Sequence, residues 1–459
     1  MEFLTKMEPF RIKSVEPLGF TTREEREVEI RKAYYNLFQI PAEKVLIDLL
    51  TDSGTSAMSA EQWAAVMRAD ESYAGARSFF RFERAVRDLT GYRKVLPVHQ
   101  GRAAERILFS VLAGPGKAIL ANSHFDTTRA NVEAAGMEAV DLPVPEAMNP
   151  AVPAPFKGNM DTLALEAEIR RRGRENIPLI LMTVTNNTVG GQPVSLKNLR
   201  EVSEIALHYR IPMFLDAARF AENAMLIRLR EPGWSTRPPA EIAREMFSLA
   251  SGCLVSAKKD PLGNMGGFLA MNDEVWAKAS QDKLILGEGF PTYGGLSGRD
   301  LEALAQGLVE AVELPYLADR IASVEYLAAG LRKSGVPIVE PPGGHGVFVD
   351  AGKLLPHIKP EGLPGQVLAC ELYLAGGIRA VEIGSLAFGR REDGKFTPSR
   401  LELVRLALPR RVYTRSHLDY VAEVFAEIAG RAKTLRALRI VEAPKALAHF
   451  SAKLAPEPA

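Results

Sequence analysis

The amino-acid sequence predicts an α/β protein with a large domain built on a mostly parallel sheet and a smaller α+β domain. Helical patterns alternate with short apolar runs between about residues 95 and 310. These runs are apolar at every position rather than at every second one, which is typical of parallel strands covered on both faces. Beyond about residue 310 the pattern changes to a long helix, two short strands and a final helix. This change indicates a second domain of mixed type.

Each expected element follows from its local pattern. Residues 99–113 carry apolar side chains at the spacing of a helix face, and Gly114-Pro115-Gly116 ends that helix. The same reasoning predicts helices at 161–172, 195–209, 323–334 and 416–435, and strands at 117–121, 177–184, 211–215, 252–255, 346–350 and 401–408. We therefore expect three parts: residues 1–56 as an arm and part of the small domain, 57–310 as the large domain, and 311–459 as the small C-terminal α+β domain.

Composition narrows the class of protein. The 57 lysines and arginines nearly balance the 56 acidic residues, so the net charge of +1 provides no bulk attraction to nucleic acid or an anionic membrane. The two cysteines, Cys253 and Cys370, cannot build a disulfide framework, which favours a reducing compartment. The first six residues show no secretion signal, and the uncharged run at 177–196 is too polar to span a bilayer. We expect a cytoplasmic enzyme without a nucleic-acid or membrane partner.

Asp216 stands directly after the expected strand 211–215. Ligands of parallel sheets bind beyond the carboxyl ends of the strands, so a carboxylate at this point has two interpretations. It caps the following helix, or it pairs with the pyridinium nitrogen of a pyridoxal cofactor and keeps the ring able to accept electrons.

Lys258 and Lys259 follow the expected strand 252–255 and precede a glycine-rich stretch at 263–267. Adjacent lysines in a loop are usually solvated charge. The coincidence of strand, lysine and glycine loop instead favours a lysine that forms a Schiff base, with the cationic neighbour lowering its pKa. The Ser256 hydroxyl, three residues before Lys259, would then reach a phosphate.

Gln100, Gly101 and Arg102 open the helix at 99–113. Free N–H groups, the positive end of the helix dipole and a bidentate donor make a phosphate site, although an ordinary helix start with an exposed arginine has the same residues. Phe125 follows the strand at 117–121. It would lie flat on an aromatic cofactor or belong to the core.

These motifs together resemble the β-eliminating lyase family, and the resemblance runs nearly end to end. The matching segments are Asp70-Glu71-Ser72-Tyr73-Ala74-Gly75, His99-Gln100-Gly101-Arg102, Gly190-Gly191-Gln192-Pro193-Val194-Ser195, Ser256-Ala257-Lys258-Lys259-Asp260, Pro291-Thr292-Tyr293-Gly294-Gly295 and Leu408-Pro409-Arg410. Each segment is a weak signal by itself, but their order along the whole chain is specific.

The resemblance implies a fold-type I, aspartate aminotransferase-like enzyme of pyridoxal 5'-phosphate that eliminates the side chain of an amino acid. Lys259 would hold the cofactor and act as base. The other cofactor residues would be Asp216 at the ring nitrogen, Arg219 and Asn187 at the ring hydroxyl, Phe125 on the ring face, and Gln100, Gly101, Arg102, Ser256 and Lys258 around the phosphate.

The resemblance also implies substrate, cation and subunit contacts. By position, Arg405 would bind the substrate carboxylate with Thr51 and Ser53 nearby, Tyr73 would be the general acid, Tyr293 would reach the active site of a neighbouring subunit, and Glu71 with the carbonyls of Gly54 and Asn264 would bind potassium. Oxygen ligands suit such a hard cation. The family forms homotetramers.

The family has two branches, which release indole from tryptophan or phenol from tyrosine. Asp126, Ile383 and His449 match the tryptophan branch, where tyrosine enzymes have threonine, arginine and phenylalanine. Asp126 as a helix N-cap and His449 as a surface residue are the structural alternatives. A carboxylate or a neutral imidazole accepts the indole N–H, whereas a phenolate favours a cation. We expect tryptophan as substrate, with tyrosine as the alternative, and Asp126 and His449 as residues that hold the indole.

Two further alternatives stay open. A transaminase with this fold would exchange keto acids instead of releasing pyruvate and ammonium. A non-catalytic module would bind pyridoxal phosphate without turnover, although Lys259 and Tyr73 argue against it.

Overall fold

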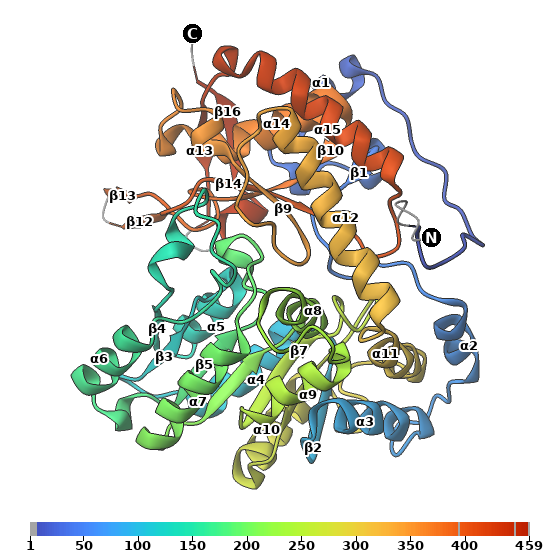
Figure 1. Ribbon diagram of the computed structural model, residues 1–459, viewed down its shortest axis with the longest axis vertical. Coiled ribbons are helices and arrows are strands. Elements are labelled where there is room, and N and C mark those ends of the chain that lie inside the picture. The colour runs from blue at the N-terminus through green and yellow to red at the C-terminus, as the bar shows by residue number, and fades with distance from the viewer. Residues whose placement is uncertain (1–6, 393–394, 445–446, 458–459) are drawn as a thin grey trace. The chain divides into compact units, whose positions relative to one another are not determined.

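The computed structural model describes residues 7–392, 395–444 and 447–457 (Figure 1). The absence of a secretion signal is predicted from the first six residues, and these lie outside the described residues. The chain divides into two compact units. Unit 1 contains Met1–Asp52, Met148–Ala154 and Ala322–Ala459, and unit 2 contains Ser53–Ala147 and Pro155–Ile321.

These boundaries differ from the three expected parts. Residues 53–56 and 311–321 belong to unit 2, and Met148–Ala154 belongs to unit 1. The last difference has a physical cause, because Glu340 donates its backbone N–H to the carbonyl of Pro150 at 2.8 Å. A contact between segments so far apart in the sequence leaves no local pattern.

Unit 2 is built on a sheet with the strand order β2-β8-β7-β6-β5-β3-β4. The strands from β7 to β4 pair in parallel, and β8 runs antiparallel to both β2 and β7. The strands are β2 (Lys94–Val98), β3 (Ala118–Ala121), β4 (Glu138–Asp141), β5 (Leu179–Thr183), β6 (Met213–Asp216), β7 (Gly252–Ser256) and β8 (Gly267–Met271). The predicted α/β class with a mostly parallel sheet is confirmed.

Both faces of this sheet are buried, which explains the unbroken apolar runs. On β5, Ile180 and Met182 pack into one apolar cluster and Leu179 and Leu181 into another. The first cluster takes side chains from α3 (Arg77–Thr90), α6 (Thr162–Arg172), α7 (Leu196–Tyr209), α8 (Phe220–Arg230), α9 (Pro239–Ser248) and α11 (Gly298–Glu310). The second takes them from α4 (Gly101–Leu112), α5 (Asp126–Ala134) and α10 (Glu274–Gly287).

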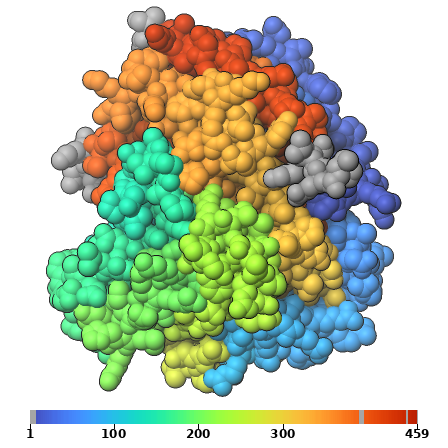
Figure 2. Space-filling view, in the orientation of Figure 1, coloured from blue at the N-terminus to red at the C-terminus, as the bar shows by residue number. Residues whose placement is uncertain are grey.

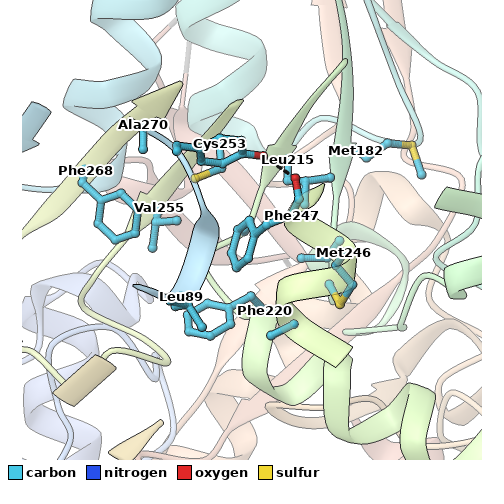
Figure 3. Packing of buried hydrophobic residues seen from close by; sticks show 14 of the residues in the cluster. Leu89, Met182, Leu215, Phe220, Met246, Phe247, Cys253, Val255, Phe268 and Ala270 are labelled. Carbon is cyan, nitrogen blue, oxygen red and sulfur yellow. Dashed lines mark hydrogen bonds between the residues drawn. The ribbon is translucent and has the colours of Figure 1, made fainter. Parts of the chain in front are cut away.

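Aromatic side chains close the first face. Figure 3 shows Phe220 and Phe247, from α8 and α9, packed beside the sheet residues Val255 and Phe268. The ring centroids of Phe220 and Phe247 are 5.6 Å apart. This rigid packing holds the strands whose carboxyl ends carry the candidate site.

Unit 1 contains smaller sheets, with β11-β14-β9 as the central antiparallel one. Its strands are β1 (Ile47–Asp48), β9 (Gly346–Asp350), β10 (Ile378–Arg379), β11 (Val381–Ile383), β12 (Arg390–Glu392), β13 (Lys395–Thr397), β14 (Leu403–Ala407), β15 (Leu438–Glu442) and β16 (Lys453–Pro456). Its helices are α1 (Arg23–Lys32), α13 (Ala351–Leu354), α14 (Pro364–Gly376) and α15 (Arg415–Gly430).

Two helix boundaries differ from the sequence expectation. Helix α12 (Leu314–Lys333) begins nearer the N-terminus than residue 323 and contains the division between the units. Helix α15 ends at Gly430 rather than at residue 435. Unit 2 also contains helix α2 (Ala60–Arg68), which lies near the beginning of that unit in the sequence.

Side chains fill the spaces between the ribbons within each unit (Figure 2). In residues 7–392, 395–444 and 447–457, none of the helices combines the length and the hydropathy that a membrane span requires.

Candidate functional site

The start of α4 lies against the end of β7. A Cβ atom on Gly101 would stand 2.6 Å from the Cβ of Ser256 and 3.0 Å from its Cα. Only glycine permits this approach. The first residues of a helix leave backbone N–H groups unpaired, so the start of α4 beside Ser256 suits a phosphate group.

Basic side chains belong to the same region. Burial lowers the pKa of Lys258, and the nearby charge of Arg102 lowers it further. An anion bound between two cations relieves this repulsion. Gln100 is the N-cap of α4, and its side-chain amide lies 3.0 Å from Nε2 of His99, which restrains the Gln100 side chain. The predicted phosphate residues therefore occupy one region of unit 2.

Lys259 connects this region to Asp216. The Lys259 ammonium donates to the Ser256 hydroxyl at 2.9 Å. Burial raises the pKa of Asp216 at the end of β6, and the charges of Lys259 and then Arg219 oppose that shift. The amine of Lys259 is thus near both the Ser256 hydroxyl and the Asp216 carboxyl group. This arrangement would suit pyridoxal phosphate if Ser256 contacts its phosphate arm and Asp216 its ring nitrogen.

Further predicted residues follow adjacent strands of the same sheet. Phe125 is the N-cap of α5 after β3, Asn187 begins a 3-10 turn after β5, and Arg219 precedes α8 after β6. Asn187 and Arg219 are buried. Because β3, β5 and β6 are neighbours, these residues meet at one edge of the sheet.

Asp260, which ends the lysine motif, has a structural role. Its Oδ2 accepts the backbone N–H groups of Ala221 at 2.6 Å and Glu222 at 3.1 Å. These groups lie in the first turn of α8, directly after Arg219. Asp260 therefore fixes the start of the helix that carries Arg219 into the site.

Asp126 is the first residue of α5, and the N-cap position belongs to Phe125. The N-cap alternative for Asp126 is therefore wrong. Its Oδ1 accepts the backbone N–H of Thr127 at 2.5 Å, and the residue is 8% exposed. A helix N-terminus stabilises the negative charge that an acceptor for an indole N–H requires.

Tyr73 and Tyr293 lie together in unit 2. Their ring centroids are 5.3 Å apart, and Phe290 lies 5.7 Å from Tyr73. A hydrogen bond with Tyr293 raises the pKa of the Tyr73 hydroxyl. Tyr73 is 72% exposed. Sequence reasoning assigned these tyrosines to different roles and did not predict that they touch in one chain.

The predicted cation residues are partly brought together. The Asn264 side-chain amide donates to the carbonyl of Gly54 at 3.0 Å, and a Cβ on Gly54 would stand 2.8 Å from the carbonyl oxygen of Asn264. Glu71 instead accepts the backbone N–H of Gly298 at 3.0 Å and pairs with Arg299 at 3.3 Å.

Arg405 contacts the residue that precedes Thr51 in unit 1. Arg405, on β14, is 7% exposed and donates to the carbonyl of Leu50 at 2.9 Å. Asp52, which follows Thr51 in the sequence, forms a fully buried ion pair with Arg410 at 3.0 Å. Ser53 lies on the other side of the division, in unit 2.

His449 and Ile383 share a neighbour, Phe38, in unit 1. The His449 ring is 5.8 Å from that of Phe38, and Ile383 lies in the apolar cluster against which Phe38 packs. His449 is 5% exposed, so the interpretation of His449 as a surface residue is wrong. Sequence reasoning missed Phe38, because no local pattern distinguishes it from another core aromatic residue.

Sequence reasoning also missed Glu105, a buried glutamate on the inner side of α4. The available signal was an acidic residue among the apolar positions of the helix at 99–113. Glu105 contacts α5 through Thr128 and Asn131.

Comparison with known proteins identifies the group to which this chain is related. Residues 48–424 match the family described as beta-eliminating lyase. The chain belongs to the β-eliminating lyase family. The tryptophanase of Salinibacter ruber is 56% identical to this β-eliminating lyase over 453 residues, which cover 99% of this chain and 96% of the relative.

Other relatives come from both branches of the family. The tryptophanase of Hyphomonas neptunium is 54% identical over 448 residues, with 98% of each chain covered. The tyrosine phenol-lyase of Symbiobacterium thermophilum is 49% identical over 450 residues, again with 98% of each chain covered. This β-eliminating lyase is thus more similar to these tryptophanases than to that phenol-lyase.

Solved structures bear out the fold. A serine palmitoyltransferase from S. paucimobilis matches with a TM-score of 0.57 at 16% identity, covering 84% of this chain and 87% of its own. A threonine aldolase from Leishmania major matches with a TM-score of 0.58 at 15% identity, covering 83% and 99%. The predicted fold-type I architecture of this β-eliminating lyase is confirmed.

Proposed function

We propose that this carbon–carbon lyase splits L-tryptophan with water into indole, pyruvate and ammonium, using pyridoxal phosphate. The observation that carries the proposal is the position of Lys259: its amine is 2.9 Å from the Ser256 hydroxyl, and its charge opposes the burial that raises the pKa of Asp216. The residues around it suit the cofactor, since the N-terminus of α4 lies against Ser256 and Asp216 places a carboxyl group at the end of β6. When bound, the cofactor supplies an electron sink for charge at the substrate α-carbon.

Each proposed residue has a defined task. Asp216 holds a proton at the ring nitrogen, Arg219 and Asn187 orient the ring hydroxyl, Phe125 stacks on the ring, and Gln100, Gly101, Arg102, Ser256 and Lys258 bind the phosphate. Arg405 binds the substrate carboxylate beside Thr51 and Ser53. Lys259 removes the α-proton, and Tyr73 delivers a proton to C3 of the indole, which makes indole a leaving group.

The choice of tryptophan over tyrosine rests on Asp126, Ile383 and His449. Ile383 is 4% exposed among apolar side chains, a setting for an indole ring rather than a phenolate. Asp126 and the buried His449 supply acceptors for the indole N–H. The higher identity to tryptophanases supports the same choice.

We propose potassium as the accompanying cation. The adjacent carbonyls of Gly54 and Asn264 are hard oxygen ligands, and Glu71 would add a carboxylate. The aromatic group of Tyr73, Phe290 and Tyr293, in which Tyr73 and Phe290 are exposed, supports a homotetramer in which a second copy completes the site. The two cysteines are free and buried, in agreement with a proposed cytoplasmic location.

The function is tested by offering L-tryptophan and L-tyrosine separately to the protein with pyridoxal phosphate and potassium. We expect indole and pyruvate from tryptophan and little phenol from tyrosine. Phenol as the main product would show that L-tyrosine, not L-tryptophan, is the substrate. Keto-acid exchange without net ammonium would indicate a transaminase.

The role of Asp126 is tested with the variant Asp126→Thr, which places the residue of the phenol-lyase branch at this position. We expect turnover of tryptophan to fall far more than turnover of S-methyl-L-cysteine, whose leaving group needs no protonation at carbon. S-methyl-L-cysteine is the internal control for cofactor binding. Equal losses on both substrates would show that Asp126 is only structural.

A further inference from the structure

A buried carboxyl group joins α4 to α5. Glu105, on α4, is 5% exposed. Its Oε1 lies 2.8 Å from the hydroxyl of Thr128, and its Oε2 accepts from the side-chain amide of Asn131 at 3.0 Å. Helix α4 begins at the phosphate region and α5 begins beside Phe125 and Asp126. Glu105 therefore connects two helix starts that the proposed function uses.

Two other acidic groups act on Glu105, one from β6 and one from α5. Burial raises the pKa of Glu105 to about 7, and the charge of Asp216, followed by that of Asp126, adds to the shift. The hydrogen bonds from Thr128 and Asn131 act in the opposite direction. A carboxyl group that is buried near two anions has a lower free energy as the neutral acid than as the carboxylate.

The surroundings of Glu105 accept a proton without losing a hydrogen bond. A threonine hydroxyl is both donor and acceptor, so a protonated Oε1 donates to Thr128 while Oε2 still accepts from Asn131. The neutral acid is therefore compatible with the observed distances.

We propose that Glu105 is a positioning residue which, as a neutral carboxyl group, holds the start of α5 against α4 without placing a third negative charge beside Asp216 and Asp126. A third anion would favour a proton on Asp216, whose carboxylate form the proposed function requires. We infer the effect of Glu105 on turnover from the proposed function. The protonation of Glu105 does not depend on that function.

The test compares Glu105→Gln, Glu105→Ala and, as control, Ser110→Ala on the exposed side of the same helix. Glutamine copies the neutral acid, because its amide donates to Thr128 and its carbonyl accepts from Asn131. At pH 6, where Glu105 is mainly the neutral acid, we expect kcat/KM for tryptophan within about threefold of wild type for Glu105→Gln and Ser110→Ala. Glu105→Ala removes both hydrogen bonds and should lower kcat/KM by ~10-fold to ~100-fold.

A second readout uses the protein without cofactor. Since the folded pKa of Glu105 is raised from 4.5 to about 7, its contribution to stability is complete below pH 4.5 and is lost as the pH rises through 7. Glu105→Gln should therefore show a smaller fall in Tm between pH 5 and pH 8 than wild type and Ser110→Ala.

Two results would overturn the proposal: Glu105→Gln as damaging to kcat/KM as Glu105→Ala, or a pH dependence of Tm identical to that of wild type. Failure of the proposed function looks different. In that case wild type itself releases no indole, while the unfolding profiles still report the proton on Glu105.

Discussion

Gly101→Ala tests the contact between α4 and β7 directly. The new methyl carbon would stand 2.6 Å from the Cβ of Ser256, 3.0 Å from its Cα and 3.2 Å from its backbone nitrogen. Non-bonded carbon atoms prefer a separation of about 3.5–4.0 Å. Because two of the three atoms belong to the Ser256 backbone, rotation of a side chain cannot relieve the overlap. The start of α4 must move away from β7 by roughly 1 Å, judged from that preferred separation.

The free-energy cost of such overpacking is about 1–3 kcal/mol. The displacement lies in the proposed phosphate site, so we expect most of this cost to appear in cofactor binding. At about 1.4 kcal/mol per factor of ten, the affinity for pyridoxal phosphate should fall by ~5-fold to ~140-fold.

The assay is a titration of the cofactor-free protein with pyridoxal phosphate, followed by absorbance, together with thermal unfolding of the cofactor-free protein. The control is Gly430→Ala at the end of α15, where a Cβ meets nothing within 4 Å. An affinity for pyridoxal phosphate equal to wild type in Gly101→Ala would refute the assignment of this contact to the phosphate site.

Three further outcomes are expected. Lys259→Ala should abolish indole release while the cofactor-free protein unfolds at nearly the wild-type temperature; substantial indole release would remove Lys259 as the base. Asp216→Asn should lower kcat for tryptophan by ~100-fold or more, since a buried charge that stabilises the reacting ring is lost, and a loss below tenfold would contradict that role. Burial and the neighbouring Glu402 raise the pKa of Glu382 from 4.5 to about 8, so its contribution to stability is complete below pH 4.5 and is lost as the pH rises through 8. Glu382→Gln should therefore flatten the fall in Tm between pH 5 and pH 9, and an unchanged slope would show that Glu382 is ionised throughout.

The residues proposed to bind the cofactor could be selected from the sequence because each stands next to its own strand. Asp216 ends β6, Ser256 ends β7, and Lys259 follows three residues later. The apolar run that predicts a strand also predicts where it ends, and in a parallel sheet these ends lie at one edge. Short-range patterns were therefore sufficient to select these residues.

Contacts between distant segments left no such pattern. The pairing of β8 with β2, the assignment of Met148–Ala154 to unit 1 and the packing of Phe38 against His449 all depend on residues far apart in the chain. The N-cap interpretation of Asp126 failed for a smaller reason, because α5 begins at Asp126 itself, one residue earlier than a cap at that position requires.

Residue type and local order were enough to establish the family, the alternation of strands and helices and the chemical groups available. Which of those groups are buried, charged or paired depends on how the chain packs. Glu105 shows the difference: its identity is visible in the helix at 99–113, but its raised pKa comes from burial and from Asp216, more than a hundred residues away. Burial and the field of neighbouring charges are properties of the packed chain, and no local stretch of sequence contains them.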